Sequence, residues 1–139
     1  MARLFALEIH TPYRLFYSGQ VESFVATLPD GRIGVYAGHA PFTGVLEDCV
    51  FRIIDAEGNA KEAAVSTGVL IVTGEKATVL SGAAEWPEEI DRKRADDARR
   101  RAEERLSESM MKYEAVRARA SLARAKNRLD VLAHMVLRP

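Results

Sequence analysis

The sequence has little cysteine and no long apolar run, and both absences narrow the kinds of protein it can encode. Its one cysteine, Cys49, allows no internal disulfide, which fits a reducing compartment. No apolar run approaches the roughly 18 residues needed to span a bilayer, so we expect no direct bilayer insertion. The start of the chain lacks an apolar stretch followed by a small-residue cleavage site, and we therefore expect no signal peptide.

Motifs that carry chemistry are also missing. The sequence holds no Walker-type phosphate loop, nucleophile elbow or dinucleotide fingerprint. No metal site is expected, because none of the histidines has metal-ligand spacing or a patterned pairing with the cysteine: His10, His39 and His134. The adjacent carboxylates at 88–89 and 96–97 fit a solvated helix face better than acid–base catalysis, because neighbours on a helix do not face each other. We therefore expect a protein that is not an enzyme in its own right.

Glycine and aromatic residues are nearly absent from the later part of the chain. All nine glycines and nine of the ten aromatic residues lie at or before Trp86. The formal charge divides at the same place, at −4 up to Trp86 and +4 beyond it. This shift predicts two domains, 1–86 and 87–139. The basic second domain suggests an acidic partner surface and no nucleic acid, because no recognised nucleic-acid motif accompanies the charge.

The first domain has the pattern of short strands. Runs with alternating or branched apolar residues lie at 4–10, 21–26, 50–54, 63–66, 69–72 and 77–80. Turn signals separate them at 29–31, 57–59 and 74–76. The pattern predicts an antiparallel sandwich or barrel, since the connections are too short for the crossover helices of a parallel sheet.

The second domain changes to a helical period. Pro87 suits the first turn of a helix, and either Ser107 or Ser109 could cap a second helix. The first apolar stripe consists of Ala95, Ala98, Ala102 and Leu106. The second stripe follows the heptad steps of a coiled coil: Met111, Ala115, Ala118, Leu122, Ala125, Leu129, Leu132 and Val136.

These alanine-rich stripes predict two helices that approach closely as an antiparallel hairpin. Alanine buries little area, and a buried methylene contributes only about 0.8 kcal/mol. The hairpin is therefore expected to be marginally stable by itself. Two interpretations stay open: a hairpin that opens or docks elsewhere, and a fixed, soluble hairpin.

Arginines recur along both predicted helices. Arg94, Arg101 and Arg105 are spaced by 7 and 4 residues, and a guanidinium fork suits phosphate oxygens. The alternative is a charged helix face partnered by Glu103 and Glu104. A second row, with a neighbouring pair, suits an acidic protein surface or simply keeps the helix soluble: Arg117, Arg124 and Arg128, with Arg119 and Lys126.

The segment Gly38-His39-Ala40-Pro41 stands in a loop-like stretch, 34–44. Its glycine and proline fix an unusual backbone. His39 could be a ligand or a base, but the favoured interpretation is a histidine that hydrogen-bonds a tight loop.

Several short motifs occur in one order along the chain. They are Gly31-Arg32-Ile33-Gly34-Val35, Gly38-His39-Ala40-Pro41, Gly68-Val69-Leu70-Ile71-Val72, Ala77-Thr78-Val79-Leu80, Ala84-Glu85, Ile90-Asp91-Arg92-Lys93-Arg94-Ala95, Ala123-Arg124-Ala125 and Arg128-Leu129. Together they resemble the epsilon-subunit family of F-type ATP synthases over essentially the whole chain. The resemblance implies a ten-stranded β-sandwich followed by an α-helical hairpin.

The resemblance also implies a function for the first domain. A sandwich of this family binds the central gamma subunit and the membrane rotor ring, and couples proton-driven rotation to ATP synthesis. The implied location is peripheral, at the cytoplasmic face of the bacterial inner membrane. The implied ring and gamma interface is Gly31, Arg32, Gly34, Gly38, His39, Ala40, Pro41 and Phe42.

For the second domain the resemblance implies regulation. The helices of some members inhibit ATP hydrolysis by reaching the alpha and beta subunits, and the matching basic residues are Arg117, Arg119, Arg124, Lys126 and Arg128. Some members also bind regulatory ATP on the folded hairpin, with no cofactor required and no essential magnesium. The matching positions are Glu85, Ile90, Asp91, Arg94, Ala95, Arg101 and Arg128.

Two other classes compete with this interpretation. A free-standing adaptor, in which a β-sandwich presents a basic coiled-coil arm to another acidic protein, explains the charge division and the heptads but not the ordered motifs. A small enzyme is the weaker rival, because no nucleophile, base or metal set converges in the sequence.

Overall fold

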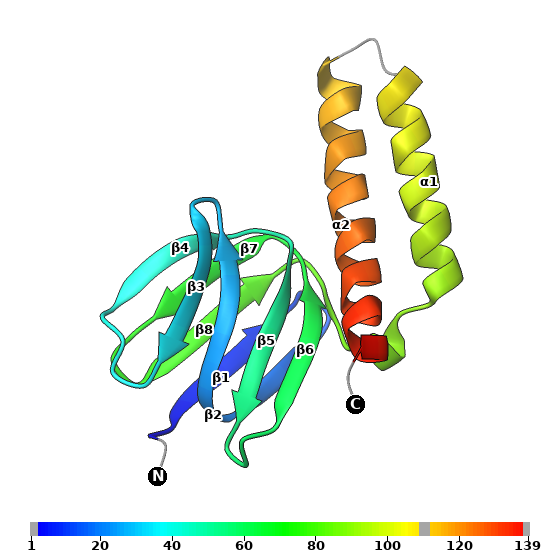
Figure 1. Cartoon of the computed structure of the whole chain (residues 1–139). Helices are drawn as coiled ribbons and strands as arrows, with labels where there is room; N and C mark the ends of the chain where they lie inside the picture. The colour runs from blue at the N-terminus through cyan, green and yellow to red at the C-terminus, as the bar shows by residue number, and fades with distance from the viewer. Residues whose placement is uncertain (1–2, 109–111, 138–139) are drawn as a thin grey trace. The chain divides into compact units, whose positions relative to one another are not determined.

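The computed structural model describes residues 3–108 and 112–137 (Figure 1). The chain divides into two compact units, Met1–Trp86 and Pro87–Pro139, called here the sandwich unit and the hairpin unit. The strands of the sandwich unit are β1 (Phe5–His10), β2 (Leu15–Leu28), β3 (Gly31–Tyr36), β4 (Phe42–Leu46), β5 (Cys49–Asp55), β6 (Ala60–Val65), β7 (Gly68–Val72), β8 (Lys76–Ser81) and β9 (Ala84–Glu85). The hairpin unit contains a 3₁₀ turn, η1 (Pro87–Glu89), and the helices α1 (Arg92–Glu108) and α2 (Lys112–Leu137).

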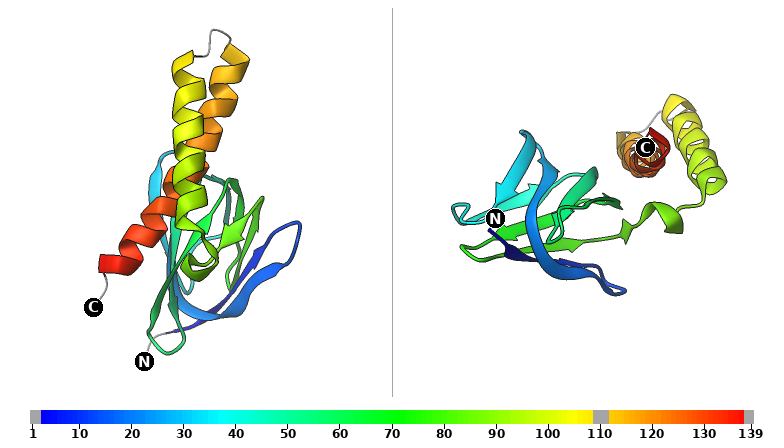
Figure 2. Two further views of the ribbon diagram at one scale, coloured as in Figure 1. Left: turned by 90° about the vertical axis from the view of Figure 1, so that its right-hand side faces the viewer. Right: turned by 60° about the horizontal axis from the view of Figure 1, so that its bottom comes forward.

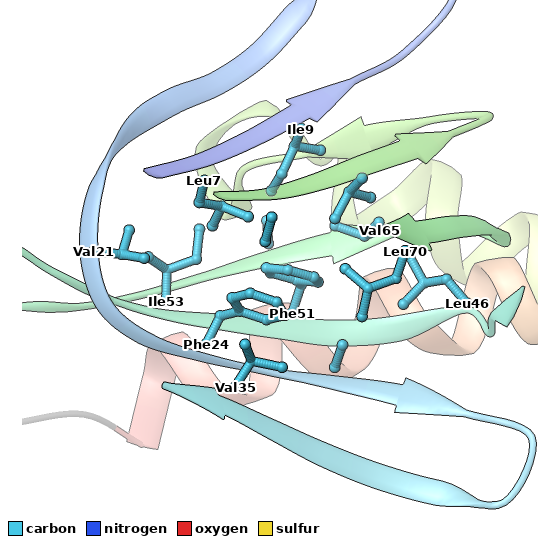
Figure 3. Close-up of a cluster of buried hydrophobic side chains, with 14 of the residues drawn as sticks. Leu7, Ile9, Val21, Phe24, Val35, Leu46, Phe51, Ile53, Val65 and Leu70 are labelled. Atoms are coloured by element: carbon cyan, nitrogen blue, oxygen red, sulfur yellow. The ribbon is translucent and has the colours of Figure 1, made fainter. Parts of the chain in front are cut away.

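The long strand β2 joins the two layers of the sandwich. Its first half pairs with β1, where Val21 lies opposite Phe5, and its second half pairs with β3 and β5. The strand curves strongly between these halves, as Figure 2 (right) and Figure 3 show, and its register against β5 shifts between Val21 and Ser23. One layer is therefore β4-β7-β8-β1 with the first half of β2, and the other is β3, the second half of β2, β5, β6 and β9.

The predicted class, a mainly antiparallel β-sandwich followed by a helical hairpin, is confirmed. The described residues form nine strands rather than the ten implied by the resemblance. The continuous course of β2 through its bend explains the difference, since a break there would divide it into two strands. One pair, β1 and β8, is parallel, from Ala6 opposite Lys76 to His10 opposite Leu80. Because these strands are far apart in the sequence, they need no crossover helix, and the argument from short connections applies only to consecutive strands.

Each of the six predicted runs overlaps a strand, but three strands had no prediction. The expected loop at 34–44 is shorter, because its first residues lie in β3 and its last in β4, which leaves 37–41 as the connection. Glycines at 31, 34 and 44 interrupt the alternation of apolar side chains in β3 and β4. The strand β9 has only two residues and carries no periodic signal at all.

The core of the sandwich unit consists of large side chains directed between the layers (Figure 3). The rings of Phe24 and Phe51 stack with centroids 5.0 Å apart, and Phe5 packs against Phe24 at 6.0 Å. Leu7 and Ile53 are completely buried beside them. Full burial of such a side chain contributes about 1.5–3 kcal/mol, so this unit is a tightly packed body.

The helix α1 begins five residues later than Pro87, the predicted first turn. Pro87 instead opens the 3₁₀ turn η1, and Asp91 is the N-cap of α1. The Asp91 carboxylate accepts a hydrogen bond from the backbone N–H of Arg94 at 3.1 Å, which satisfies one of the unpaired donors at the helix start.

The predicted seam is the one that holds the two helices together. Its buried members are Ala95, Ala102, Ala118, Ala125 and Leu132, and its half-buried members are Ala98, Leu106, Ala115, Leu122 and Leu129. Met111, Ser109 and the side chain of Val136 lie outside the described residues. Ser107 belongs to the last turn of α1, where its hydroxyl donates to the Glu104 carbonyl at 2.9 Å, so it does not cap the next helix. In the described part of the chain, neither helix has a stretch long and apolar enough to cross a membrane.

Candidate partner-binding surfaces

The residues expected at the ring and gamma interface divide between the two ends of β3. Gly31 and Arg32 open the strand beside the β2–β3 turn, whereas the segment 38–41 follows its other end. A strand rises about 3.3 Å per residue, so the six residues of β3 separate these groups by roughly 16 Å. Gly34 lies within β3 and Phe42 begins β4, so they are strand residues rather than loop residues. The set therefore forms two patches.

The loop between β3 and β4 is held by its own hydrogen bonds. Gly38 has a φ of 80°, a conformation that favours glycine. The His39 N–H donates to the Tyr36 carbonyl at 3.2 Å, and His39 Nδ1 donates to the Ala40 carbonyl at 2.8 Å. The His39 ring packs on Phe42 with centroids 5.2 Å apart. His39 thus stabilises a tight loop, and no group of three or more metal-ligating side chains occurs among residues 3–108 and 112–137.

A row of apolar side chains crosses the outer face of one layer of the sandwich. Strand pairing sets Val45 beside Val69, Val69 beside Leu80, Leu80 beside His10, and His10 beside Leu15. The four aliphatic members, in that order along the row, are 60, 37, 46 and 53 % exposed. We call these five residues the outer row. Aligned apolar side chains on a solvent-facing layer are typical of a protein interaction surface.

A pair of charged groups borders the outer row beside His10. Glu8 lies two residues before His10 on β1, and its carboxylate accepts hydrogen bonds from Lys76 Nζ at 2.6 Å and from His10 Nε2 at 2.9 Å. The Lys76 hydrogen bond, with a smaller contribution from His10, lowers the pKa of Glu8 below its ordinary value. Glu8 and Lys76 therefore form a neutralised pair next to the row.

An aromatic stack fixes the end of the sandwich unit. Trp86, the last residue of the unit, stacks on Phe16 of β2 with centroids 4.5 Å apart, and Tyr17 meets the indole edge-on at 6.1 Å. The Arg14 guanidinium lies 5.0 Å from the centre of the Phe16 ring and donates to the Ala84 carbonyl at 3.4 Å. The chain is consequently anchored up to Trp86, immediately before Pro87.

The arginines of α1 fall into two groups. Arg99 pairs with Asp96 at 2.7 Å and with Glu103 at 3.5 Å, while Arg100 pairs with Asp97. The Arg99 hydrogen bond lowers the pKa of Asp96. Within residues 3–108 and 112–137, the side chains of a second group are exposed and form no ion pair: Arg94, Arg101 and Arg105. The alternative of a helix face partnered by Glu103 and Glu104 is therefore met at Arg99, through Glu103, and not at the three arginines for which it was considered.

The basic residues of α2 flank the seam on both sides. With 3.6 residues per turn, Arg117, Arg124 and Arg128 lie on one flank, and Arg119 and Lys126 lie on the other. Arg128 is half-buried and the other four are exposed. The set expected to be inhibitory is thus two rows rather than one face.

The residues expected to bind ATP have different structural roles. Ala95 is a buried seam residue, Ile90 is buried just before α1, and Asp91 caps the helix. Arg94 and Arg101 are exposed on α1, and Glu85 lies in β9 of the sandwich unit. A separate groove between the helices contains none of the expected residues and is lined by Arg105, Glu108, Glu114, Arg117, Ala118 and Ser121.

The chain is a two-unit protein, with an apolar row on a packed sandwich and exposed arginines on a helical hairpin. The model of the ATP synthase delta/epsilon chain β-sandwich domain matches residues 4–87, and that of the long α-helix domain of the same chain matches residues 88–133. The ATP synthase epsilon chain of Caldanaerobacter subterraneus subsp. tengcongensis is 44% identical over 131 residues, covering 94% of this chain and 95% of the relative. The ATP synthase epsilon chain of Caldicellulosiruptor bescii is 46% identical over 127 residues, covering 91% of this chain and 92% of the relative.

The chain therefore belongs to the ATP synthase delta/epsilon chain family, which confirms the resemblance seen in the motifs. Membership also confirms the prediction that the chain is a subunit of a larger enzyme and not a catalyst in its own right. A solved structure with a similar fold is a chain of the Euglena gracilis mitochondrial ATP synthase, with a TM-score of 0.79 at 18% identity, covering 99% of this chain and 83% of the other. A chain from the Tetrahymena thermophila mitochondrial ATP synthase central stalk and c-ring has a TM-score of 0.59 at 12% identity, covering 91% of this chain and 95% of the other.

Proposed function

We propose that the chain is a central-stalk subunit whose sandwich unit binds the gamma subunit and the rotor ring. In this role it passes torque from the ion-driven ring to the shaft during ATP synthesis, at the cytoplasmic face of the membrane. The observation that carries the proposal is that the delta/epsilon family models match both units in order. A body that transmits torque must resist deformation, and the stacked core around Phe24 and Phe51 supplies that stiffness.

The two patches at the ends of β3 are the proposed ring and gamma contacts. The β3–β4 loop suits a contact surface because Ala40 and Pro41 are exposed while His39 holds the backbone. A loop that is ordered before binding loses little conformational entropy on docking. The patch with Gly31 and Arg32 lies at the other end of β3, so we assign the two patches to different partners or to different subunits of the ring.

Purified gamma subunit tests this function directly. The full chain, immobilised at micromolar concentration, is expected to retain gamma, and an unrelated β-sandwich protein is the control. Absence of a complex at micromolar concentration contradicts the proposal and favours the adaptor, whose arm would bind a different acidic protein.

We further propose that the hairpin unit regulates ATP hydrolysis through the alpha and beta subunits. The alanine seam buries little apolar area, and the two basic rows of α2 suit an acidic surface. Removing residues 88–139 is expected to raise ATP hydrolysis by the assembled enzyme. A chain with Arg117, Arg124 and Arg128 changed to Gln separates charge from length, and unchanged hydrolysis in both variants contradicts regulation.

The exposed arginines of α1 support a second role for the hairpin, the binding of ATP without hydrolysis. Arg94 and Arg101 have no carboxylate partner among the described residues, and guanidinium groups suit phosphate oxygens. Titration calorimetry on the full chain is expected to detect ATP binding that Arg94→Ala weakens. The matched control is Arg100→Ala, because Arg100 already pairs with Asp97. No heat of binding at millimolar ATP contradicts this role.

A further inference from the structure

The groove between α1 and α2 holds a serine hydroxyl among arginine side chains from both helices. We propose that Ser121 is a phosphorylation site, and that its phosphate binds Arg105, Arg117 and Arg124 and so ties the two helices together. The contact concerns the hairpin unit alone. Its consequence for ATP hydrolysis rests on the proposed function, namely that the hairpin regulates hydrolysis.

Ser121 lies on the flank of α2 that carries arginines. Residues three and four apart on a helix are neighbours, with about 5–6 Å between their Cβ atoms. Arg117 stands four residues before Ser121, and Arg124 stands three residues after it. Arg124 Nη2 already donates a hydrogen bond to Ser121 Oγ at 3.2 Å, and Arg117 lines the same groove as Ser121. A group attached to this oxygen therefore starts between two guanidinium groups of its own helix.

Arg105 supplies a third guanidinium from the other helix. It lies in the last turn of α1 and lines the groove together with Ser121. Its side chain is exposed and forms no ion pair within residues 3–108 and 112–137. The groove has a volume of about 630 Å³, within the range of small-ligand sites, so it has room for a phosphate.

The charges along the groove favour a phosphate at Ser121. A phosphoserine carries about −1.5 to −2 charges at pH 7 and three acceptor oxygens, which guanidinium forks bind strongly. The acidic residues of the groove, Glu108 and Glu114, lie nearer the connection between the helices. At 1.5 Å per residue, Glu114 is roughly 10 Å from Ser121 along α2, about one Debye length. The arginines of α2 are within roughly 6 Å, so they outweigh the more distant carboxylates.

The residues before Ser121 suit recognition by a serine kinase. Arginines stand four and two positions before the serine, at 117 and 119, where they suit a kinase with an acidic peptide groove. In the transfer, Ser121 Oγ attacks the γ-phosphorus of ATP while a carboxylate of the kinase takes the hydroxyl proton. The bond from that phosphorus to the bridging oxygen breaks, and ADP leaves. Because Ser121 is half-buried, the transfer requires local opening of α2, and the phosphate binds the arginines when the helix reforms.

Phosphoserine incorporated genetically at position 121 of the full chain tests the contact between the helices. Hydrogen exchange of peptides from α1 and α2 is expected to slow at least about 10-fold, because charge-assisted hydrogen bonds must break before the helices separate. Phosphoserine at position 107 is the matched control. Ser107 lies in the last turn of α1, within three residues of Glu104 and Glu108 and at the negative end of the helix dipole. Its phosphate should leave exchange unchanged or make it faster.

Arg105→Gln distinguishes a tie between the helices from a local effect within α2. With phosphoserine at position 121, this variant should lose most of the slowing, because Arg105 is the groove arginine contributed by α1. Arg100→Gln removes the same charge from a different face of α1, where Arg100 already pairs with Asp97, and should keep the slowing. Equal slowing in Arg105→Gln, or no slowing in the phosphorylated chain, overturns the proposed contact.

Peptide mass spectrometry of the chain from its native cells tests the modification itself. Phosphate on Ser121 is expected in cells grown with ample or with limited energy supply. An unmodified Ser121 under both conditions overturns the phosphorylation site, even where the exchange experiment supports the contact.

The hydrolysis assay separates failure of this inference from failure of the proposed function. In the assembled enzyme, phosphoserine at position 121 is expected to raise ATP hydrolysis towards the level reached by removing residues 88–139, because a tied hairpin opens less. If removal of these residues leaves hydrolysis unchanged, the proposed regulation fails, and the exchange experiment still decides the contact. If removal raises hydrolysis and phosphoserine does not, the regulatory consequence of the phosphate is overturned.

Discussion

The two units of this chain are packed in opposite ways. Phe24 and Phe51 stack without exposure at the centre of the sandwich unit, whereas the hairpin unit closes over alanines such as Ala102 and Ala125. A buried Phe or Leu contributes about 1.5–3 kcal/mol, and a buried methyl or methylene group only about 0.8 kcal/mol. The chain thus combines a unit packed by large side chains with a unit packed mainly by alanines. This difference suits the proposed role of a torque-bearing body joined to a regulatory arm.

Phe51→Ala should have the largest effect on stability, and it tests whether the core of the sandwich unit is tightly packed. The ring is fully buried against Phe24, so its loss is expected to reduce the free energy of unfolding by about 3–5 kcal/mol. Tyr36→Ala is the matched control, because that ring is 66 % exposed and its removal should change stability by less than about 0.5 kcal/mol. Urea denaturation of both variants provides the measurement, and equal losses would mean that the core is not closely packed.

Ala125→Leu tests whether the two helices of the hairpin unit approach closely along the alanine seam. Ala125 is 1 % exposed in the seam, so a larger side chain must push the helices apart at a cost of about 1–3 kcal/mol. Ala123→Leu adds the same atoms on the exposed side of α2 and should leave stability nearly unchanged. Circular dichroism at 222 nm during thermal unfolding reports the helices. A higher thermal stability of Ala125→Leu would show that the space between the two helices accommodates a leucine, and that the helices are not closely packed at this position.

The same contrast explains which parts of the structure were predictable from the sequence. The seam was predictable because the apolar residues of a helix recur every three or four residues, as Ala118, Ala125 and Leu132 do. Strands with branched side chains were predictable because their apolar residues also recur at short range, at every second position. The strand β3 was not, because Gly31 and Gly34 interrupt its alternation.

The outer row had no local signal at all. Val45, Val69 and Leu80 become neighbours only through the pairing of β4, β7 and β8, so their alignment depends on registers that a single sequence does not state. The separation of Gly31 from the 38–41 loop was hidden in the same way, since it depends on β3 being extended. Surfaces made by long-range pairing were therefore the part that sequence reasoning missed.

Asp91→Ala tests whether the start of α1 is set locally. Loss of the carboxylate that accepts from the Arg94 N–H is expected to destabilise the hairpin unit by about 1 kcal/mol and leave the sandwich unit unchanged. Asp91→Asn keeps a capping oxygen and should retain most of the stability. Hydrogen exchange, followed separately for peptides from α1 and from β5, measures both units. Faster exchange in β5 as well would mean that the two units unfold together, which would contradict a difference in stability between them.

The smallest expected effect is on the acid stability of the hairpin unit. The Arg99 hydrogen bond holds the pKa of Asp96 below its ordinary value, so the ionised form is favoured in the folded state. The stabilisation is present above the unfolded-state pKa of the carboxyl and is lost as pH falls through the lower folded-state pKa. Asp96→Asn should therefore reduce the difference in helical signal between neutral and strongly acidic solution, whereas Glu8→Gln, which removes a similarly paired carboxylate of β1, should leave the helices unaffected. Because the Asp96 and Arg99 side chains are both partly exposed, 0.5 M salt should weaken the Asp96 effect, and a salt-independent response would contradict an electrostatic origin.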